Sequence, residues 1–164
     1  MKKTLLIVLP LLFIMSCEED KDVSAFVGTW DLTFLGEYEN SNCTGSLDSL
    51  LWAFAQAFEF EVSISIDEDE TFEMSTSSIN SDTTETGTWS ESSDGSLITE
   101  GGSLSDGEGV LSADGNSFSI TIMEDAHCKD SNFEETSHTD STSCQDAGND
   151  WYEPNCTLFV FTKQ

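Results

Sequence analysis

The residues best suited to chemistry gather in residues 124–155. Both histidines of the chain, His127 and His138, lie in this stretch among carboxylates, and imidazole with carboxylate is a ligand combination that zinc uses. A zinc site needs three or four ligands at fixed positions, and this stretch shows no recognised ligand spacing. The pattern therefore favours a solvated acidic loop over a metal site, and we predict neither metal nor cofactor. The carboxylates in question are Glu124, Asp125, Asp130, Glu134, Glu135 and Asp140.

Catalytic motifs are missing from the rest of the sequence. It contains no Gly-x-Ser-x-Gly nucleophile motif, no glycine-rich phosphate loop and no His-Glu-x-x-His pair. We therefore predict that the protein is not an enzyme. An enzyme that uses His127 and His138 is the least favoured alternative.

Charge limits the partners of the chain. It has 32 acidic residues against 5 lysines and no arginine, and its formal net charge is −27. Nucleic acid and anionic lipid are bound through lysine and arginine, so we predict no nucleic-acid partner. Solubility is the favoured explanation of the negative charge, and binding of cations or basic partners is the alternative.

The first seventeen residues have the composition of an export signal. A short basic start precedes an apolar run of about eleven residues, against roughly twenty needed to span a bilayer. Ser16, a small residue, stands directly before Cys17. This segment resembles the signal of bacterial lipoproteins, whose lipobox ends in the cysteine that receives the lipid after cleavage. The resemblance implies lipid attachment at Cys17 and anchoring in the outer membrane, on its periplasmic or cell-surface face.

The remaining chain reads as one all-β domain. We divide the sequence into a signal peptide (1–16), a lipidated acidic tether (17–25) and a barrel domain (26–164). Apolar residues alternate with polar ones in short segments, as they do in half-buried strands. Asp94-Gly95 and Asp114-Gly115 predict tight hairpin turns. The eight predicted strands are residues 26–35, 59–66, 71–75, 85–91, 96–100, 109–112, 117–123 and 156–162.

The connections between these strands alternate between long and short. In an up-and-down antiparallel sheet, alternate connections lie at opposite ends, so all the long ones share one end. Eight such strands can close into a barrel without exposed edges. We therefore predict an eight-stranded antiparallel up-and-down barrel, with the loop 124–155 over its open mouth.

One segment breaks the alternation and predicts a short helix over residues 46–57, after the first strand. Its apolar residues recur at helical spacing, and Ser46 is the expected N-cap. Trp52, Phe54 and Phe58 are expected to cap the core, with a lid over the mouth as the alternative. The apolar residues at this spacing are Leu47, Leu50, Leu51, Phe54 and Phe58.

Four cysteines remain once Cys17 is assigned to lipid. An even count in an exported domain predicts two disulfides, and four cysteines allow three pairings. The barrel layout places all four at the mouth and makes the last strand a neighbour of the first. We therefore favour the pairs Cys43–Cys156 and Cys128–Cys144.

Two short motifs carry a family resemblance. Gly28-Thr29-Trp30 opens the first strand and Gly87-Thr88-Trp89 lies in a later one. These motifs and the closing strand resemble bacterial lipocalin-like lipoproteins, which open with Gly-x-Trp. The resemblance implies that Trp30 plugs the closed end of the barrel. Where the family has an arginine over this tryptophan, the present chain has Lys163. Because the first strand starts near Cys17, we expect the closed end to face the membrane.

The interior of the barrel is the predicted ligand site. An eight-stranded barrel either fills with side chains or holds one small ligand. We predict non-catalytic binding of a small apolar ligand. The alternative is a filled barrel that binds a protein or a glycan through its disulfide-fixed loops. The residues expected to face inward are Phe60, Val62, Ile64, Phe72, Met74, Phe118, Ile120 and Ile122.

Overall fold

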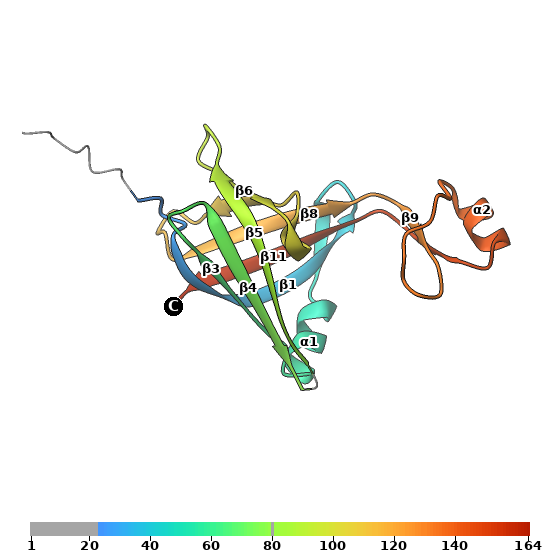
Figure 1. Ribbon diagram of the computed structural model, residues 1–164, viewed down its shortest axis with the longest axis horizontal. Coiled ribbons are helices and arrows are strands. Elements are labelled where there is room, and N and C mark those ends of the chain that lie inside the picture. Colours follow the sequence, from blue (N-terminus) through green and yellow to red (C-terminus); the bar gives the residue numbers. More distant parts are fainter. Residues whose placement is uncertain (1–22, 80) are drawn as a thin grey trace, which may run out of the picture.

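The computed structural model describes residues 23–79 and 81–164, so the predicted signal peptide and Cys17 lie outside the described residues. Eight antiparallel strands form a closed barrel, because the last of them pairs back onto the first (Figure 1). The predicted fold class is confirmed. In ring order the strands are β1 (Gly28–Asn40), β3 (Glu61–Ile66), β4 (Thr71–Ser78), β5 (Ser81–Glu91), β6 (Leu97–Glu100), β7 (Glu108–Leu111), β8 (Ser117–Glu124) and β11 (Asn155–Lys163).

The barrel interior is packed with side chains, and five of the residues predicted to face inward, Ile64, Phe72, Met74, Phe118 and Ile120, are buried there. Phe118 lies within an aromatic cluster, with its ring centroid 4.9 Å from that of Trp30 and 5.0 Å from that of Phe161. Leu104 adds to this core from the connection between β6 and β7, where a short 3-10 helix, η1 (Gly102–Leu104), buries it. Such close packing of large side chains is typical of a solid protein interior.

The closed end of the barrel is organised around Trp30, which is fully buried. Its indole Nε1 donates a hydrogen bond to the carbonyl oxygen of Phe26 at 2.8 Å. Lys163, the register partner of Trp30, places its Nζ 5.0 Å from the indole ring and donates to the carbonyl oxygen of Val27 at 3.3 Å. Lysine therefore occupies the position where the family resemblance implies arginine, and it makes the cation–π contact.

Gly87 has a steric role in the second Gly-Thr-Trp motif. It pairs with Phe72 across β4 and β5, and a Cβ added to it would lie 2.5 Å from Cε1 of the Phe72 ring. Only glycine leaves room for this buried ring. Trp89, two residues on, is also anchored, because its Nε1 donates to the carbonyl oxygen of Asp67 at 2.8 Å.

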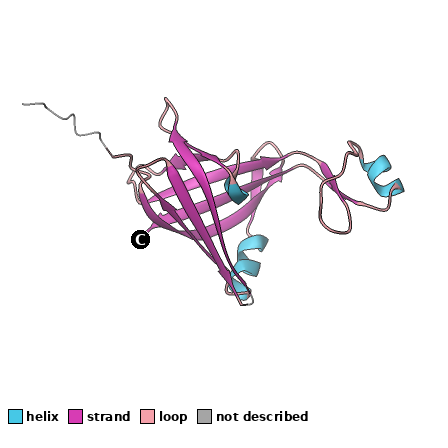
Figure 2. Cartoon of the chain, viewed as in Figure 1, coloured by secondary structure: helices cyan, strands magenta, loops and turns pink. Residues whose placement is uncertain are grey.

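The first long connection begins as a strand, β2 (Thr44–Asp48), and continues as the helix α1 (Leu50–Ala57). The expected N-cap at Ser46 is wrong, because Tyr38 of β1 pairs with Leu47 and draws residues 44–48 into the sheet. The helix starts four residues later, where the Asp48 carboxylate accepts a hydrogen bond from the backbone N–H of Leu50 at 2.8 Å. Figure 2 shows the helices in the connections between strands.

The last long connection does not cover the mouth, contrary to expectation. It extends beyond the ends of β8 and β11 as a separate lobe, residues 125–154, at the right of Figure 1. Within this lobe β9 (His127–Lys129) pairs with β10 (Asp150–Tyr152), which prolongs the β8–β11 hairpin outward. The helix α2 (Ser141–Asp146), absent from the sequence prediction, completes the lobe.

Both favoured disulfides are confirmed. Cys43–Cys156 ties the β1–β2 turn to the start of β11, with its Cα atoms 5.3 Å apart. Cys128–Cys144 ties β9 to α2 within the lobe, with its Cα atoms 5.8 Å apart. The first bridge therefore restrains the barrel, and the second restrains the lobe alone.

Substitutions of Trp30 and Lys163 test how much each residue at the closed end contributes to stability. We expect Trp30→Ala to lower the free energy of unfolding by about 3–5 kcal/mol, because it leaves a cavity in the core. Lys163→Met keeps the aliphatic packing, loses the cation and should lower it by only about 0.5–1 kcal/mol. Urea unfolding followed by circular dichroism measures both. Equal losses of unfolding free energy in the two variants would contradict the conclusion that burial of Trp30 contributes more than the cation of Lys163.

Candidate functional site

The predicted ligand residues divide into two groups. Five of them belong to the buried core, where other side chains surround them, and Ile122 is half-buried against the same core. Phe60 and Val62 instead line a groove of about 500 Å³ beside α1. The five buried residues are Ile64, Phe72, Met74, Phe118 and Ile120.

The groove lies where the barrel wall changes its pairing. β1 pairs with β3 only between Gly28 and Asp31. A bulge follows at Thr33, and β1 then pairs with β2 in place of β3. The start of β3 is thus separated from β1, and α1 lies beside this separation in Figure 1. Trp52 of α1 packs beside Phe34 of β1, with ring centroids 6.4 Å apart.

The lining of this groove combines an apolar part with a polar part. Trp52 and Val62 pack against the core cluster, so the apolar part is continuous with the barrel interior. A hydroxyl-rich part comes from the serines of β3 and β4, which the alternation assigns to the outer face. Because four apolar and six polar residues line the groove, it suits an amphiphilic small molecule better than a purely apolar one. The lining residues are Asp31, Leu32, Trp52, Phe60, Glu61, Val62, Ser63, Ser75, Ser77 and Gln164.

The charged groups at the groove are carboxylates. Asp31 accepts a hydrogen bond from the side-chain amide of Gln164 at 2.7 Å, and Glu61 is exposed. The two lysines of the described residues are engaged elsewhere: Lys163 lies over Trp30, and Lys129 lies 5.3 Å from the ring of Tyr152 in the lobe. An anionic ligand would therefore meet repulsion at this groove.

A second hollow, of about 600 Å³, lies between β1 and β2. Three of its lining residues are the carboxylates Glu37, Glu39 and Asp48. Tyr38 and Leu47 add some apolar surface, but no aromatic side chain from the helix or the core contributes. It is therefore less suited to an apolar ligand than the groove beside α1.

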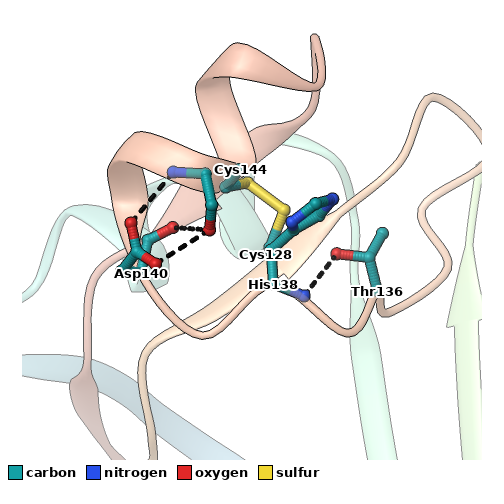
Figure 3. Close-up of a disulfide and its surroundings, with 6 residues drawn as sticks. Cys128, Thr136, His138, Asp140 and Cys144 are labelled. Carbon is teal, nitrogen blue, oxygen red and sulfur yellow. Dashed lines mark hydrogen bonds between the residues drawn. A yellow bond between two sulfur atoms is a disulfide. The ribbon is translucent and has the colours of Figure 1, made fainter.

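Two acidic residues of the lobe, Asp130 and Asp140, stabilise local backbone structure. Asp130 accepts hydrogen bonds from the backbone N–H groups of Asn132 and Glu134 at 2.8 and 3.0 Å. Asp140 caps α2 and accepts from the backbone N–H of Ser143 at 2.9 Å (Figure 3). His138 lies beside the disulfide in the same view. Within residues 23–79 and 81–164, no three His, Cys, Asp or Glu side chains are placed to hold a metal ion.

His127 is stacked at the base of the lobe. Its ring lies 5.1 Å from that of Tyr152, with an angle of 8° between the planes. Its Nδ1 is 2.9 Å from the carbonyl oxygen of Asp125. These contacts give His127 a packing role in the β9–β10 hairpin.

Sequence reasoning missed part of the groove. Leu32, Ser63 and Ser75 lie in predicted strands, but they were not predicted to line a site. What alternation could not give is the separation of β3 from β1, because pairing with β2 depends on contacts distant in sequence. Trp52 was expected to cap the core, and its packing agrees with that expectation.

Comparison with protein-family models, with curated proteins and with solved structures finds no match for this chain. In the part of the chain that the structure describes, no helix has the length and apolar character that a membrane crossing needs. The case for function therefore depends on the geometry and on the sequence resemblance.

Acidification should destabilise α2 through its cap. Hydrogen bonds from the Ser143 backbone N–H, and then from its hydroxyl, lower the pKa of Asp140 from its ordinary value of 3.8. Because the pKa of Asp140 is lower in the folded state than in the unfolded state, its stabilising effect is complete above the unfolded-state pKa. This stabilisation is lost as the pH falls through the folded-state pKa. We expect NMR Cα shifts of residues 141–146 to lose helical character as the pH falls below about 4.

Asp140→Asn is the matched control, because asparagine also caps helices but does not titrate in this range. The helical shifts of this variant should stay constant over the same pH interval. If they change as in the natural chain, the pH dependence does not come from Asp140.

Proposed function

We propose that this chain is a lipid-anchored envelope lipoprotein of lipocalin-like type. It binds a small, largely apolar ligand, whose polar group is neutral or cationic, without catalysis. The observation that carries the ligand proposal is the groove beside α1, where Trp52, Phe60 and Val62 present apolar surface next to serine hydroxyls. Membership in the lipocalin-like group rests on the Gly-x-Trp opening and agrees with the closed barrel.

Two independent features, the N-terminal segment and the disulfides, support export. The basic start, the apolar run and Ser16-Cys17 resemble a lipoprotein signal. Two disulfides join all four cysteines of the described residues, and disulfides persist in oxidising compartments such as the bacterial periplasm or the cell surface. Both observations support a working protein outside the cytoplasm, with the membrane as partner through the lipid on Cys17.

The chemistry of the ligand follows from charge and lining. Asp31 and Glu61 disfavour a carboxylate or phosphate on the ligand, and the net charge of −27 disfavours its approach. A neutral alcohol, ester or amide can use Ser63 and Ser75 as hydrogen-bond partners, and a cationic head can face the carboxylates. Fatty acids and nucleotides are thus poor candidates.

One observation favours the alternative, a module that binds a protein or a glycan. Phe133 is 75% exposed at the tip of the turn that Asp130 organises in the lobe. Its backbone has a positive φ of 63°, which is uncommon for a bulky residue. An aromatic side chain held outward on a disulfide-fixed lobe is a suitable anchor for a partner.

The ligand proposal can be tested by native mass spectrometry of the protein purified from its own host. We expect a retained organic mass in the natural chain, and its loss or an affinity at least about tenfold weaker in Trp52→Ala, because the aromatic wall of the groove is removed. Trp151→Ala, in the lobe, is the control and should keep the ligand. Retention by Trp52→Ala with loss in Trp151→Ala would contradict the groove as the site.

The lipid proposal is tested by the intact mass of the protein extracted from membranes. We expect a mass that begins at Cys17 and exceeds the polypeptide mass by that of the attached acyl chains. Cys17→Ser should remove this increment, and Ser16→Ala, which keeps a small residue before the cysteine, should preserve it. An unmodified mass from the natural chain would refute the proposed anchoring.

A further inference from the structure

The outer face of α1 is apolar and exposed, although Phe54 and Phe58 were expected to cap the core. Leu50 is 57% exposed, Phe54 53% and Phe58 60%. The helix is held to the barrel by its opposite side, where Ala55 is buried and Trp52 is half-buried. Its apolar stripe therefore has no partner among the described residues. Leu47 and Leu51 extend this stripe and are also exposed.

A second element brings apolar surface to the same place. Ile79, at the turn between β4 and β5, is 61% exposed. Glu61 at the start of β3 pairs with Ser77, so the turn at Ile79 lies beside the end of α1. In Figure 1 both segments meet at the lowest point of the molecule, where they form a protruding tip. Exposed apolar side chains from two separate elements thus converge at this α1 tip, defined as residues 47–58 and Ile79.

We infer that the α1 tip rests on the surface of a bilayer of zwitterionic lipid, with Leu50, Phe54 and Phe58 in the interfacial region. Amphipathic helices bind membranes in this way, through apolar side chains that enter the headgroup boundary. The inference builds on the proposed lipid anchor, which would hold the tip near the membrane. The bilayer would be zwitterionic because anionic lipid repels a chain of net charge −27.

The charge pattern favours lipid over a second copy of the chain. Residues 49–58 contain no charged residue, but Asp48 and Glu59 flank them. Two copies meeting through this face would bring these carboxylates together. Neither Lys129 nor Lys163 is near enough to offset them, since one lies in the lobe and the other at the closed end. A neutral bilayer surface adds no such repulsion.

The shape of the tip agrees with this placement. A protruding apolar surface fits a deformable lipid layer directly, whereas a protein partner would need a matching hollow. Val23 lies beside Glu68 and Glu70 of the β3–β4 turn, at the opposite end of these two strands from Ile79, and a six-residue tether, residues 17–22, reaches at most about 20 Å. The barrel would then lie on its side, instead of standing on its closed end as the sequence suggested.

A pair of tryptophan reporters tests the contact. Phe54→Trp places one on the α1 tip, and Met123→Trp places the matched control on the outer face of β8, where Met123 is 69% exposed. Each full-length protein is reconstituted in phosphatidylcholine vesicles with or without brominated acyl chains, and the emission of the natural chain is subtracted. We expect bromine to quench roughly half of the added emission in Phe54→Trp and almost none in Met123→Trp.

Further outcomes decide whether the α1 tip contacts lipid or a second copy of the chain. Adding Leu50→Gln and Phe58→Gln to Phe54→Trp should relieve the quenching, because the apolar stripe is removed while the reporter stays. Equal quenching in both reporter variants, or none in Phe54→Trp, overturns the inference. The inference is also overturned if the fluorescence of the introduced tryptophan in Phe54→Trp changes with protein concentration and not with lipid, because this would indicate self-association. An intact mass without acyl chains refutes the proposed anchor separately, since the quenching is measured on its own.

Discussion

The barrel depends on strand β1, which is hydrogen-bonded to three other strands. Near the closed end β1 pairs with β3 on one side and with β11 on the other, and this double pairing closes the sheet. After the bulge at Thr33 it exchanges β3 for β2. Closure leaves no free edge for aggregation along this part of the barrel. The exchange of partners, in turn, separates the wall beside α1, so one strand determines both the closed fold and the position of the groove.

Because the barrel interior is occupied, binding surfaces have to lie outside it. Leu104 enters from the side and joins the aromatic cluster of Phe118, Trp30 and Phe161. The accessible surfaces include the groove beside α1, the apolar α1 tip and the projecting lobe with Phe133. The α1 tip and the lobe belong to connections between strands, whereas the groove is formed by α1 against residues of β1, β3 and β4. Loops carried on a rigid strand scaffold commonly supply binding surfaces.

The sequence predicted the local structure better than the placement of the connections. The strand predicted over residues 59–66 is observed as β3, which starts two residues later and ends at the same residue, because the alternation there reflects one buried and one exposed face. The two Asp-Gly turns were also correct, since they depend on local conformation. The start of α1 was wrong because pairing of Leu47 with Tyr38 links residues that are distant from the helix signal. The lobe was missed for the same reason, as its hairpin continues strands from the barrel.

The candidate site shows a further limit of periodicity. Helical spacing identifies an apolar face, but it does not say whether that face is buried. In α1 the stripe containing Phe54 is exposed, and the less conspicuous Trp52 and Ala55 make the contacts with the barrel. Phe60 and Val62 were predicted to face a ligand inside the barrel, whereas in the structure they line the groove beside α1.

The bridge between Cys43 and Cys156 joins residues 113 positions apart. All the strands from β3 to β8 lie within the covalent ring that it forms. If a protease cuts one peptide bond in any hairpin turn of this ring, the two pieces stay joined through the sulfur atoms. Their effective concentration for each other remains high, so the cut strands can stay paired. Cleavage of one peptide bond within this ring therefore does not release a fragment from the molecule.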